Sequence, residues 1–174
     1  IRFAAPTAGV DGTFLVLNGD VISDLDVAAL VDRHHDSNAE ATLHLIAVDD
    51  PSAYGVVELG PDDRILRFVE KPAPGTAPSN LINAGTYVFE SSVLDLIEPD
   101  VPVSVERMTF PQLAERGRIF GAATDDYWID VGRPELLLQA NLDRLAGRFD
   151  RAIDHPVADG RGVDPAAQVA PTVT

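Results

Sequence analysis

A continuous apolar run near the start of the chain constrains the fold more than any other feature. Residues 13–17, Thr-Phe-Leu-Val-Leu, lie between Asp-Gly and Asn-Gly-Asp. Such a run of branched and aromatic residues is typical of a strand buried on both faces, as at the centre of a parallel sheet. Ser23, three residues before Asp26, begins a cap-box-like pattern, and the helix that it predicts reaches about Asp36. A second apolar strand over residues 41–48 completes a predicted β-α-β unit.

The rest of the chain continues this alternation and adds an antiparallel hairpin. Turn residues at 60–63, Gly-Pro-Asp-Asp, separate the strand-like residues 56–59 and 64–70. Further strands and helices are expected at residues 81–90, 92–97, 111–116, 118–123 and 134–146. The predicted fold class is therefore α/β, with a mixed, mainly parallel sheet and an antiparallel insertion.

Composition excludes several classes of function. The 174 residues include 28 acidic and 13 basic side chains, and the formal charge of −15 argues against sequence-independent binding to nucleic acid or anionic lipid. The chain has no cysteine, so disulfides, thiolate metal sites and thiol nucleophiles are excluded. No apolar run approaches the roughly 20 residues of a membrane-spanning helix. The histidines at positions 34, 35, 44 and 155 lack metal-binding spacing and are predicted to be structural or surface residues.

Neither end of the chain has the features of a domain boundary. Residues 1–5 read as an apolar helical fragment without an initiator Met, a cap or a signal-peptide pattern, so we expect a truncated N-terminus. Valine and proline recur at a period of six between residues 163 and 171, which favours a hexapeptide-repeat β-helix over chance recurrence. The predicted organisation is one domain over residues 1–149, then a linker and the first β-helix repeats over residues 150–174.

Two carboxylates that follow apolar segments are candidate metal ligands. Asp20 ends the tripeptide Asn18-Gly-Asp directly after the first strand, where open α/β sheets place ligands. Asp130 lies in Trp128-Ile-Asp-Val-Gly, where the glycine allows close approach of backbone or ligand. Mg²⁺ prefers one or two carboxylates together with phosphate oxygens and water. The alternatives are a simple turn at residues 18–20 and a helix N-cap at Asp130.

Lys71 is the only lysine in a chain whose other 12 basic residues are arginine. It lies in Glu70-Lys-Pro72, at the end of a strand and before a loop rich in Pro, Gly and Ser. We expect Pro72 to restrict Lys71 to an extended backbone, which would fix the direction of its ammonium group. A compact cation suits an anionic phosphate, and the alternative is a solvent-exposed lysine.

Two further glycines lie at the edges of predicted strands. They are Gly55, in Tyr54-Gly-Val, and Gly85, in Asn83-Ala-Gly. Glycine weakens a strand, so its presence there indicates either a bulge or the close approach of a ligand. Asn83 offers donors and an acceptor, as a group that recognises a hydroxylated ligand would.

Six segments, taken in order, resemble the motifs of the sugar-1-phosphate nucleotidylyltransferases. The resemblance extends over residues 13 to about 146, and the combination is more specific than any single segment. The segments are Phe14-Leu-Val-Leu-Asn-Gly-Asp20, Tyr54-Gly-Val-Val-Glu58, Phe68-Val-Glu-Lys-Pro72, Asn83-Ala-Gly-Thr-Tyr-Val-Phe89, Phe110-Pro-Gln-Leu113 and Trp128-Ile-Asp-Val-Gly132. The hexapeptide pattern makes the chain most similar to the mannose-1-phosphate guanylyltransferases, which carry a C-terminal left-handed β-helix.

The resemblance implies a Rossmann-like nucleotidyltransferase fold and a specific reaction. A nucleoside triphosphate, here GTP, would react with a hexose-1-phosphate, here mannose-1-phosphate, to give a nucleotide-sugar and pyrophosphate. The resemblance further implies a cytoplasmic homo-oligomer that uses Mg²⁺. Asp20 and Asp130 would hold the Mg²⁺, and Lys71 would bind phosphate and be essential for catalysis. The substrate would contact Asn18, Gly55, Glu70, Lys71, Asn83 and Gly85, with Glu70 accepting a sugar hydroxyl.

One departure from the family pattern leaves other functions open. The family begins with a Gly-Gly-x-Gly-Thr-Arg-Leu type segment that holds the nucleotide, and this chain has no such segment, so we expect only the sugar and metal side of the site. Arg133 also stands where Thr or Lys is more usual. The alternatives are a glucose-1-phosphate thymidylyl- or uridylyltransferase and a non-catalytic regulatory homologue that binds a nucleotide-sugar. A metal-dependent glycosyltransferase is a third, through Asp24-Leu-Asp26.

Overall fold

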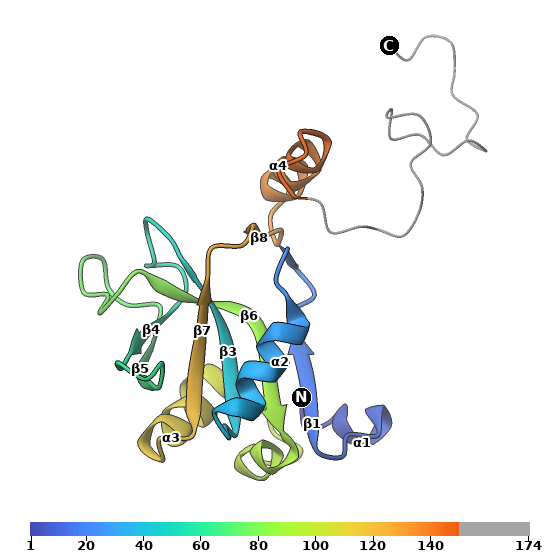
Figure 1. Ribbon diagram of the computed structural model, residues 1–174, viewed down its shortest axis with the longest axis vertical. Helices are drawn as coiled ribbons and strands as arrows, with labels where there is room; N and C mark the ends of the chain where they lie inside the picture. The colour runs from blue at the N-terminus through green and yellow to red at the C-terminus, as the bar shows by residue number, and fades with distance from the viewer. Residues whose placement is uncertain (150–174) are drawn as a thin grey trace, which may run out of the picture.

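The computed structural model describes residues 1–149, which form a six-stranded sheet and a small second sheet (Figure 1). The larger sheet contains β1 (Thr13–Leu17), β3 (Ala41–Ala47), β4 (Gly55–Leu59), β5 (Ile65–Glu70), β6 (Leu81–Glu90) and β7 (Ile119–Thr124). The second sheet pairs β2 (Val21–Ser23) with β8 (Trp128–Asp130). The predicted linker and β-helix repeats fall on residues 150–174, outside the described part of the chain, and stay a prediction.

Helices connect and cover these strands. They are α1 (Ala5–Ala8), α2 (Val27–Asp36), the 3₁₀-helix η1 (Ser91–Leu96), the π-helix η2 (Val105–Thr109), α3 (Phe110–Glu115) and α4 (Pro134–Leu145). Asp26 is the N-cap of α2, because its Oδ1 accepts from the backbone N–H groups of Ala28 and Ala29 at 3.0 and 3.2 Å. The cap-box role expected of Ser23 is wrong, since its Oγ accepts from the nearby Leu25 N–H before the helix begins.

In the six-stranded sheet, most strands that run in the same direction are not neighbours. β1, β3 and β4 all run antiparallel to β6, and β7 runs parallel to β3, so four strands share one direction. The mixed α/β class is thus confirmed, and the β4–β5 hairpin is the expected antiparallel insertion. However, β3–β7 is the only parallel pair among the described strands, so the expected predominance of parallel pairing is wrong. The physical reason is that β6 inserts between β1 and β3.

The expectation that residues 13–17 form a central, doubly buried strand is also wrong. Within residues 1–149, β1 has β6 as its only strand neighbour. Phe14 and Val16 pack on the core, whereas Leu15 and Leu17 are 40% and 60% exposed. An apolar run thus gives the strand but not its place in the sheet, because that place depends on β6, which is far away in sequence.

The core lies on both faces of β3 and β6. Alternate residues of β6 face opposite sides: Tyr87 and Phe89 pack with Phe110 of α3, and Val88 packs with Leu30 of α2. Figure 1 shows α2 on one side of the sheet and α3 near its lower end. The result is a layered α/β domain whose sheet is covered on both faces. No helix among the described residues has the length and apolar character needed to span a membrane.

Candidate active site

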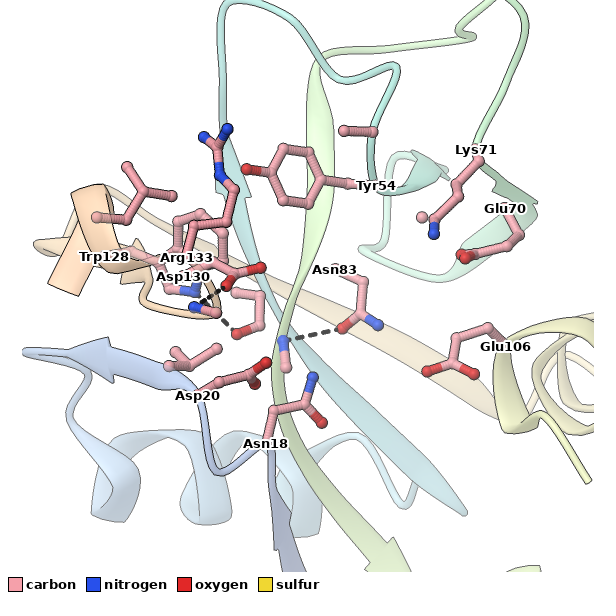
Figure 2. A pocket seen from close by; sticks show the side chains of 17 residues that line it. Asn18, Asp20, Tyr54, Glu70, Lys71, Asn83, Glu106, Trp128, Asp130 and Arg133 are labelled. Atoms are coloured by element: carbon pink, nitrogen blue, oxygen red, sulfur yellow. Dashed lines mark hydrogen bonds between the residues drawn. The ribbon is translucent and has the colours of Figure 1, made fainter. Parts of the chain in front are cut away.

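A polar cleft of about 610 Å³ opens where β1 ends, beside the middle of β6 (Figure 2). It is lined by every residue that the sequence predicts for the site: Asn18, Asp20, Gly55, Glu70, Lys71, Asn83, Gly85 and Asp130. These residues come from the ends of four strands, β1, β4, β5 and β8, and from within β6, and they are up to 112 positions apart in the chain. The fold therefore brings the predicted residues together without exception.

A bulge in β6 organises the floor of the cleft. Gly85 has φ +80°, and the register between β3 and β6 shifts next to it. The bulge carbonyls accept from other motifs: Ala84 from the indole N–H of Trp128 at 2.8 Å, and Gly85 from the backbone N–H of Asn18 at 2.8 Å. A Cβ at Gly85 would lie 2.7 Å from the side-chain Nδ2 of Asn18, so this position needs glycine for space as well as for backbone conformation.

The pairing of β2 with β8 brings Asp20 and Asp130 together. Val21 of β2 lies opposite Asp130, and the Val131 N–H donates to the Asp20 carbonyl at 2.7 Å. Neither of these three-residue strands was expected from the sequence. Their pairing supplies the contact between two aspartates that are 110 positions apart.

Gly132 shows how closely the two carboxylates converge. A Cβ at this position would lie 3.0 Å from Oδ1 of Asp130 and 3.4 Å from Oδ2 of Asp20. The Gly132 N–H donates to the same Asp130 oxygen at 2.9 Å. Asp130 is therefore not a helix N-cap: the N-cap of α4 is Arg133, and no side chain in the described part of the chain caps that helix.

The carboxylate pair meets the requirements of a hard divalent cation. Two nearby carboxylates suit Mg²⁺ when phosphate and water oxygens complete its shell. Within residues 1–149, no group of three or more acidic or histidine side chains forms a metal site from protein alone. Asp20 and Asp130 could thus hold a cation that a phosphorylated ligand also binds.

Lys71 reaches the cleft from an unusual backbone conformation. Its φ is +49°, in the left-handed region, so the extended backbone expected from Pro72 is wrong. The proline does disfavour the right-handed helical region. Lys71 lies outside that region in a left-handed conformation, in which its N–H donates to the Tyr54 carbonyl at 2.9 Å. A non-glycine residue held in this region indicates local strain, which often occurs at functional sites.

Gly55 makes room for the side chain next to Lys71. Gly55 pairs with Glu70 across the β4–β5 hairpin. A Cβ on Gly55 would clash with the Phe68 ring and lie 2.9 Å from Oε2 of Glu70. The glycine thus lets Glu70 lie across the hairpin, with its carboxylate turned into the cleft beside Lys71 (Figure 2).

Hydrogen bonds fix the orientation of Asn83. Its Oδ1 accepts from the Gly85 N–H at 3.1 Å, and its Nδ2 donates to the Tyr87 hydroxyl at 2.8 Å. Burial raises the pKa of Tyr87 to about 12, so this phenol is neutral near pH 7. One amide hydrogen and one oxygen lone pair of Asn83 are then available to a ligand.

Several cleft residues were not predicted as site residues. Tyr54 and Trp128 pack edge to face, with centroids 5.8 Å apart, and both belong to motifs that signalled the site. Arg133 was noted only as a departure from the family pattern, and it adds a second cation to the cleft. Glu106 lies in none of the quoted motifs, and no sequence signal marked it.

Comparisons of this chain with known proteins give consistent matches. A family model described as nucleotidyl transferase matches residues 2–147. A mannose-1-phosphate guanylyltransferase of Mycobacterium tuberculosis is 40% identical over 164 residues, covering 89% of this chain and 45% of the relative. A mannose-1-phosphate guanyltransferase of Yarrowia lipolytica is 41% identical over 169 residues, covering 92% of this chain and 46% of the relative. The chain thus spans less than half the length of these relatives.

Solved structures with the same fold extend the comparison. A crystal structure described as a glucose-1-phosphate thymidylyltransferase from Bacillus anthracis has a TM-score of 0.72 at 23% identity, covering 87% of this chain and 61% of that one. HddC from Yersinia pseudotuberculosis, complexed with GMP-PN, has a TM-score of 0.65 at 25% identity, covering 82% of this chain and 60% of that one. The first likeness, at this low identity, concerns the fold alone.

Proposed function

The chain belongs to the nucleotidyl transferase family, and on that premise we propose that its protein transfers a nucleotidyl group from a nucleoside triphosphate to a hexose-1-phosphate. We propose GTP and mannose-1-phosphate as the substrates, because the relatives that match 89% and 92% of the chain carry mannose-1-phosphate guanylyltransferase names. The observation that carries the proposal is the meeting of the predicted residues in one cleft.

The proposed reaction is an in-line displacement at phosphorus. A phosphate oxygen of the sugar-1-phosphate forms a bond to the α-phosphorus of the triphosphate, the bond from that phosphorus to the bridging oxygen breaks, and pyrophosphate leaves. The protein forms no covalent intermediate, so catalysis rests on positioning and on offsetting negative charge. This requirement is strong in a chain with a formal charge of −15.

One group of cleft residues would bind the sugar-1-phosphate, and a second group would bind the divalent cation. Lys71 would bind the sugar phosphate and hold the attacking oxygen near the α-phosphorus. Asn83 and Glu70 would hydrogen-bond to the sugar, and Gly55 and Gly85 allow close approach. Asn18 lies over the bulge at Gly85, where it can contact the ligand.

Asp20 and Asp130 are the residues that would hold the divalent cation, which we propose to be Mg²⁺. When bound, this ion supplies positive charge to the phosphate oxygens. The carboxylates fix its place through the β2–β8 pairing and through Gly132.

The experiment that tests the function is a substrate grid. The full-length protein encoded with this sequence is assayed with each nucleoside triphosphate against mannose-1-phosphate and glucose-1-phosphate, and pyrophosphate release is followed. We expect the highest kcat/KM for GTP with mannose-1-phosphate. A preference for thymidine or uridine triphosphate with glucose-1-phosphate would favour the related transferase. Binding of a nucleotide-sugar without turnover of any pair would favour a regulatory homologue.

Two properties of the whole protein complete the proposal: a cytoplasmic location and a homo-oligomeric assembly. Microscopy of the tagged protein and light scattering of the purified protein test them separately. A membrane-bound or monomeric protein would contradict the corresponding part and leave the proposed chemistry unaffected.

A further inference from the structure

Glu106 lines the cleft on the same side as Glu70 and Lys71, although no motif marks it. Figure 2 shows its carboxylate turned toward Asn83 across open space. It comes from η2, which packs beside β5, the strand that ends at Glu70. Two carboxylates from separate elements therefore face one part of the cleft, away from the carboxylate pair at Gly132.

The buried residues of the π-helix η2 fix the position of Glu106. The Phe110 N–H donates to the Val105 carbonyl five residues earlier, and Val105, Thr109 and Phe110 are buried. A π-helical turn is rare, weaker than an α-helical turn and often found at functional sites. Here its buried residues anchor the turn to the core, while Glu106 between them is only half-buried and faces the cleft.

One oxygen of Glu106 is engaged and the other is available. Oε2 accepts from the Ser104 hydroxyl at 2.9 Å, and Ser104 Oγ in turn accepts from the Arg107 N–H at 3.3 Å. Among the described residues, Oε1 has no hydrogen-bond or ion-pair partner. The side chain is therefore oriented by its own helix while it keeps an acceptor for a ligand.

The chemistry of this part of the cleft selects a neutral, hydroxylated group. Carboxylates repel phosphate, so Glu70 and Glu106 disfavour the anionic part of a substrate. They lack a third acidic or histidine neighbour in the described chain with which to form a metal site. Hydroxyl groups of a sugar are donors that two carboxylates and the Asn83 amide can bind together. Lys71, beside them, is placed for the phosphate of the same molecule.

We propose that Glu106 is a specificity-determining residue that accepts a hydrogen bond from one hydroxyl of the sugar-1-phosphate. This rests on the proposed function and adds a contact to it. Glu70, from the end of β5, binds a second hydroxyl, so the two carboxylates together select the arrangement of hydroxyls on the ring. Loss of a hydrogen bond to a charged group costs about 10- to 100-fold in binding.

The test is Glu106→Gln in the full-length protein, with kinetics for both substrates and a set of monodeoxy sugar-1-phosphates. We expect KM for the sugar-1-phosphate to rise about tenfold or more, while KM for the nucleoside triphosphate changes less than twofold. The wild type should discriminate against the deoxy analogue that lacks the bound hydroxyl. The variant should lose that discrimination for one analogue and keep it for the others.

Two control variants separate sugar binding from structure and from charge. Ser104→Ala removes the hydrogen bond that orients Glu106 but keeps the carboxylate. Glu115→Gln removes an equal charge from the exposed end of α3, outside the cleft. The proposal is overturned if Glu115→Gln gives the same rise in KM, or if Glu106→Gln raises both KM values equally.

The same variants distinguish this proposal from the proposed function. If the wild type turns over no substrate pair, the proposed reaction fails, and calorimetric titration with mannose-1-phosphate and glucose-1-phosphate decides the role of Glu106. Weaker binding in Glu106→Gln than in Glu115→Gln supports the sugar contact, whereas equal binding in the two variants, or no binding in the wild type, rejects it.

Discussion

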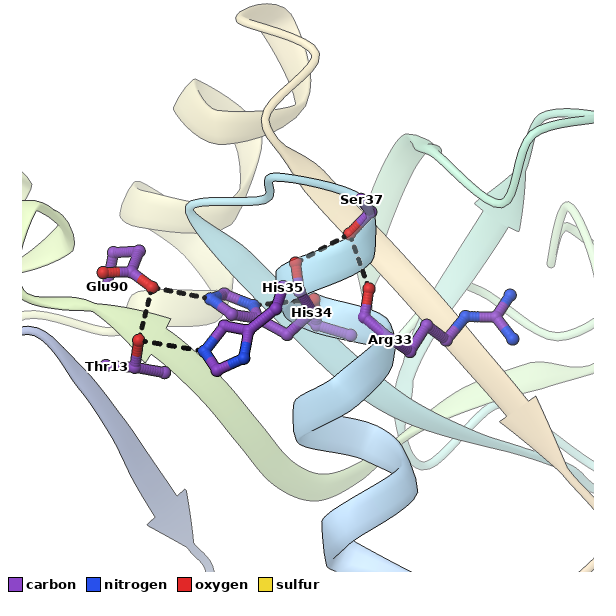
Figure 3. A network of polar contacts seen from close by, with 7 residues as sticks. Thr13, Arg33, His34, His35, Ser37 and Glu90 are labelled. Atoms are coloured by element: carbon purple, nitrogen blue, oxygen red, sulfur yellow. Dashed lines mark hydrogen bonds and ion pairs between the residues drawn. The ribbon is translucent and has the colours of Figure 1, made fainter.

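Two polar clusters lie at opposite ends of the β1–β6 pairing, and they differ in how their hydrogen bonds are used. The pairing runs from Thr13 opposite Glu90 to Leu17 opposite Thr86. The cleft lies past the Leu17 end. At the other end, Thr13 and Glu90 join His34, His35 and Thr42 in a network across β1, α2, β3 and β6 (Figure 3).

At the Thr13 end the polar side chains hydrogen-bond to one another, and we call this network the closed cluster. His34, 1% exposed, has its Nε2 3.1 Å from Oε1 of Glu90 and its Nδ1 2.9 Å from the Thr42 hydroxyl. A single neutral tautomer satisfies both contacts, with Nε2–H donating to the carboxylate and the hydroxyl donating to Nδ1. Burial lowers the pKa of His34, and the hydrogen bond from Thr13 is the main cause of the lowered pKa of Glu90.

At the Leu17 end the polar side chains face the cleft, and we call this group the open cluster. The carboxylates of Asp20 and Glu70, the Lys71 ammonium and Oε1 of Glu106 have no ion-pair partner among the described residues. Polar groups that satisfy one another stabilise a fold, whereas converging groups that face a cleft can bind a ligand. The difference predicts that changes in the open cluster affect activity and changes in the closed cluster affect stability.

The largest effect is expected for Lys71→Ala in the full-length protein. On the proposed function, loss of the cation beside two anionic substrates should lower kcat/KM by about 1,000-fold, at the upper end of the range seen when a key electrostatic group is removed. Circular dichroism should stay unchanged, because the exposed side chain supports no packing. Arg67→Ala is the control, since it removes an exposed cation from β5 outside the cleft. Near-wild-type activity of Lys71→Ala would refute the assigned role.

The carboxylate pair should give the next largest effect. If Asp20 and Asp130 hold the proposed Mg²⁺, Asp20→Asn and Asp130→Asn should each lower the Mg²⁺-dependent rate by about 100-fold, because each removes one of the two carboxylate charges that would hold the cation. Titration of activity with Mg²⁺ should show a higher concentration requirement in both variants. If only one variant responds, the two carboxylates do not share a metal ion.

Local sequence patterns predicted most elements of the fold. The strand expected over residues 81–90 matches β6, and the hairpin and α4 appear within a residue or two of their expected bounds. These elements are set by residues close together in sequence. The antiparallel insertion of β6 beside β1, the three-residue strands β2 and β8, and the left-handed backbone of Lys71 were missed, because distant pairings determine each of them.

The site was predicted more completely than the sheet, since short motifs carry its chemistry directly. Each predicted residue lines the cleft. Glu106 was missed because its position depends on a π-helical turn, and an acidic residue beside a serine has no distinctive sequence pattern. A motif thus identified residues that line one cleft, but not a cleft side chain placed by packing.

His44 is intermediate between the two clusters, because only one of its two ring nitrogens has a hydrogen-bond partner among the described residues. Its effect on stability and on activity can therefore be compared with theirs. His44 is buried, with Nε2 2.8 Å from the Thr124 hydroxyl, and Nδ1 has no hydrogen-bond partner within residues 1–149. Burial lowers its pKa from 6.5 to about 4, so the unfolded chain binds a proton in this interval and the folded chain does not. The stability that this site contributes is complete above pH 6.5 and is lost as the pH falls toward 4.

The measurement for His44 is the free energy of unfolding against pH for the wild type and His44→Gln. The variant should lose up to about 3 kcal/mol of the pH dependence between 6.5 and 4, which is the difference between the two pKa values expressed as free energy. Activity at pH 8 should be unchanged. Identical pH profiles would show that His44 is already protonated in the folded protein or that it titrates normally.

The smallest effect is expected from the closed cluster itself, through Thr42→Val. This nearly isosteric change removes the hydroxyl that donates to Nδ1 of the buried His34, while Glu90 still requires the proton on Nε2. Leaving one buried acceptor unsatisfied costs about 1–2 kcal/mol. Chemical denaturation should show that loss, and kcat/KM of the full-length protein should stay within twofold of the wild type, because the network lies at the far end of β1 from the cleft. A fall in activity at unchanged stability would mean that the closed cluster also has a functional role, and the distinction between the two ends of the pairing would be wrong.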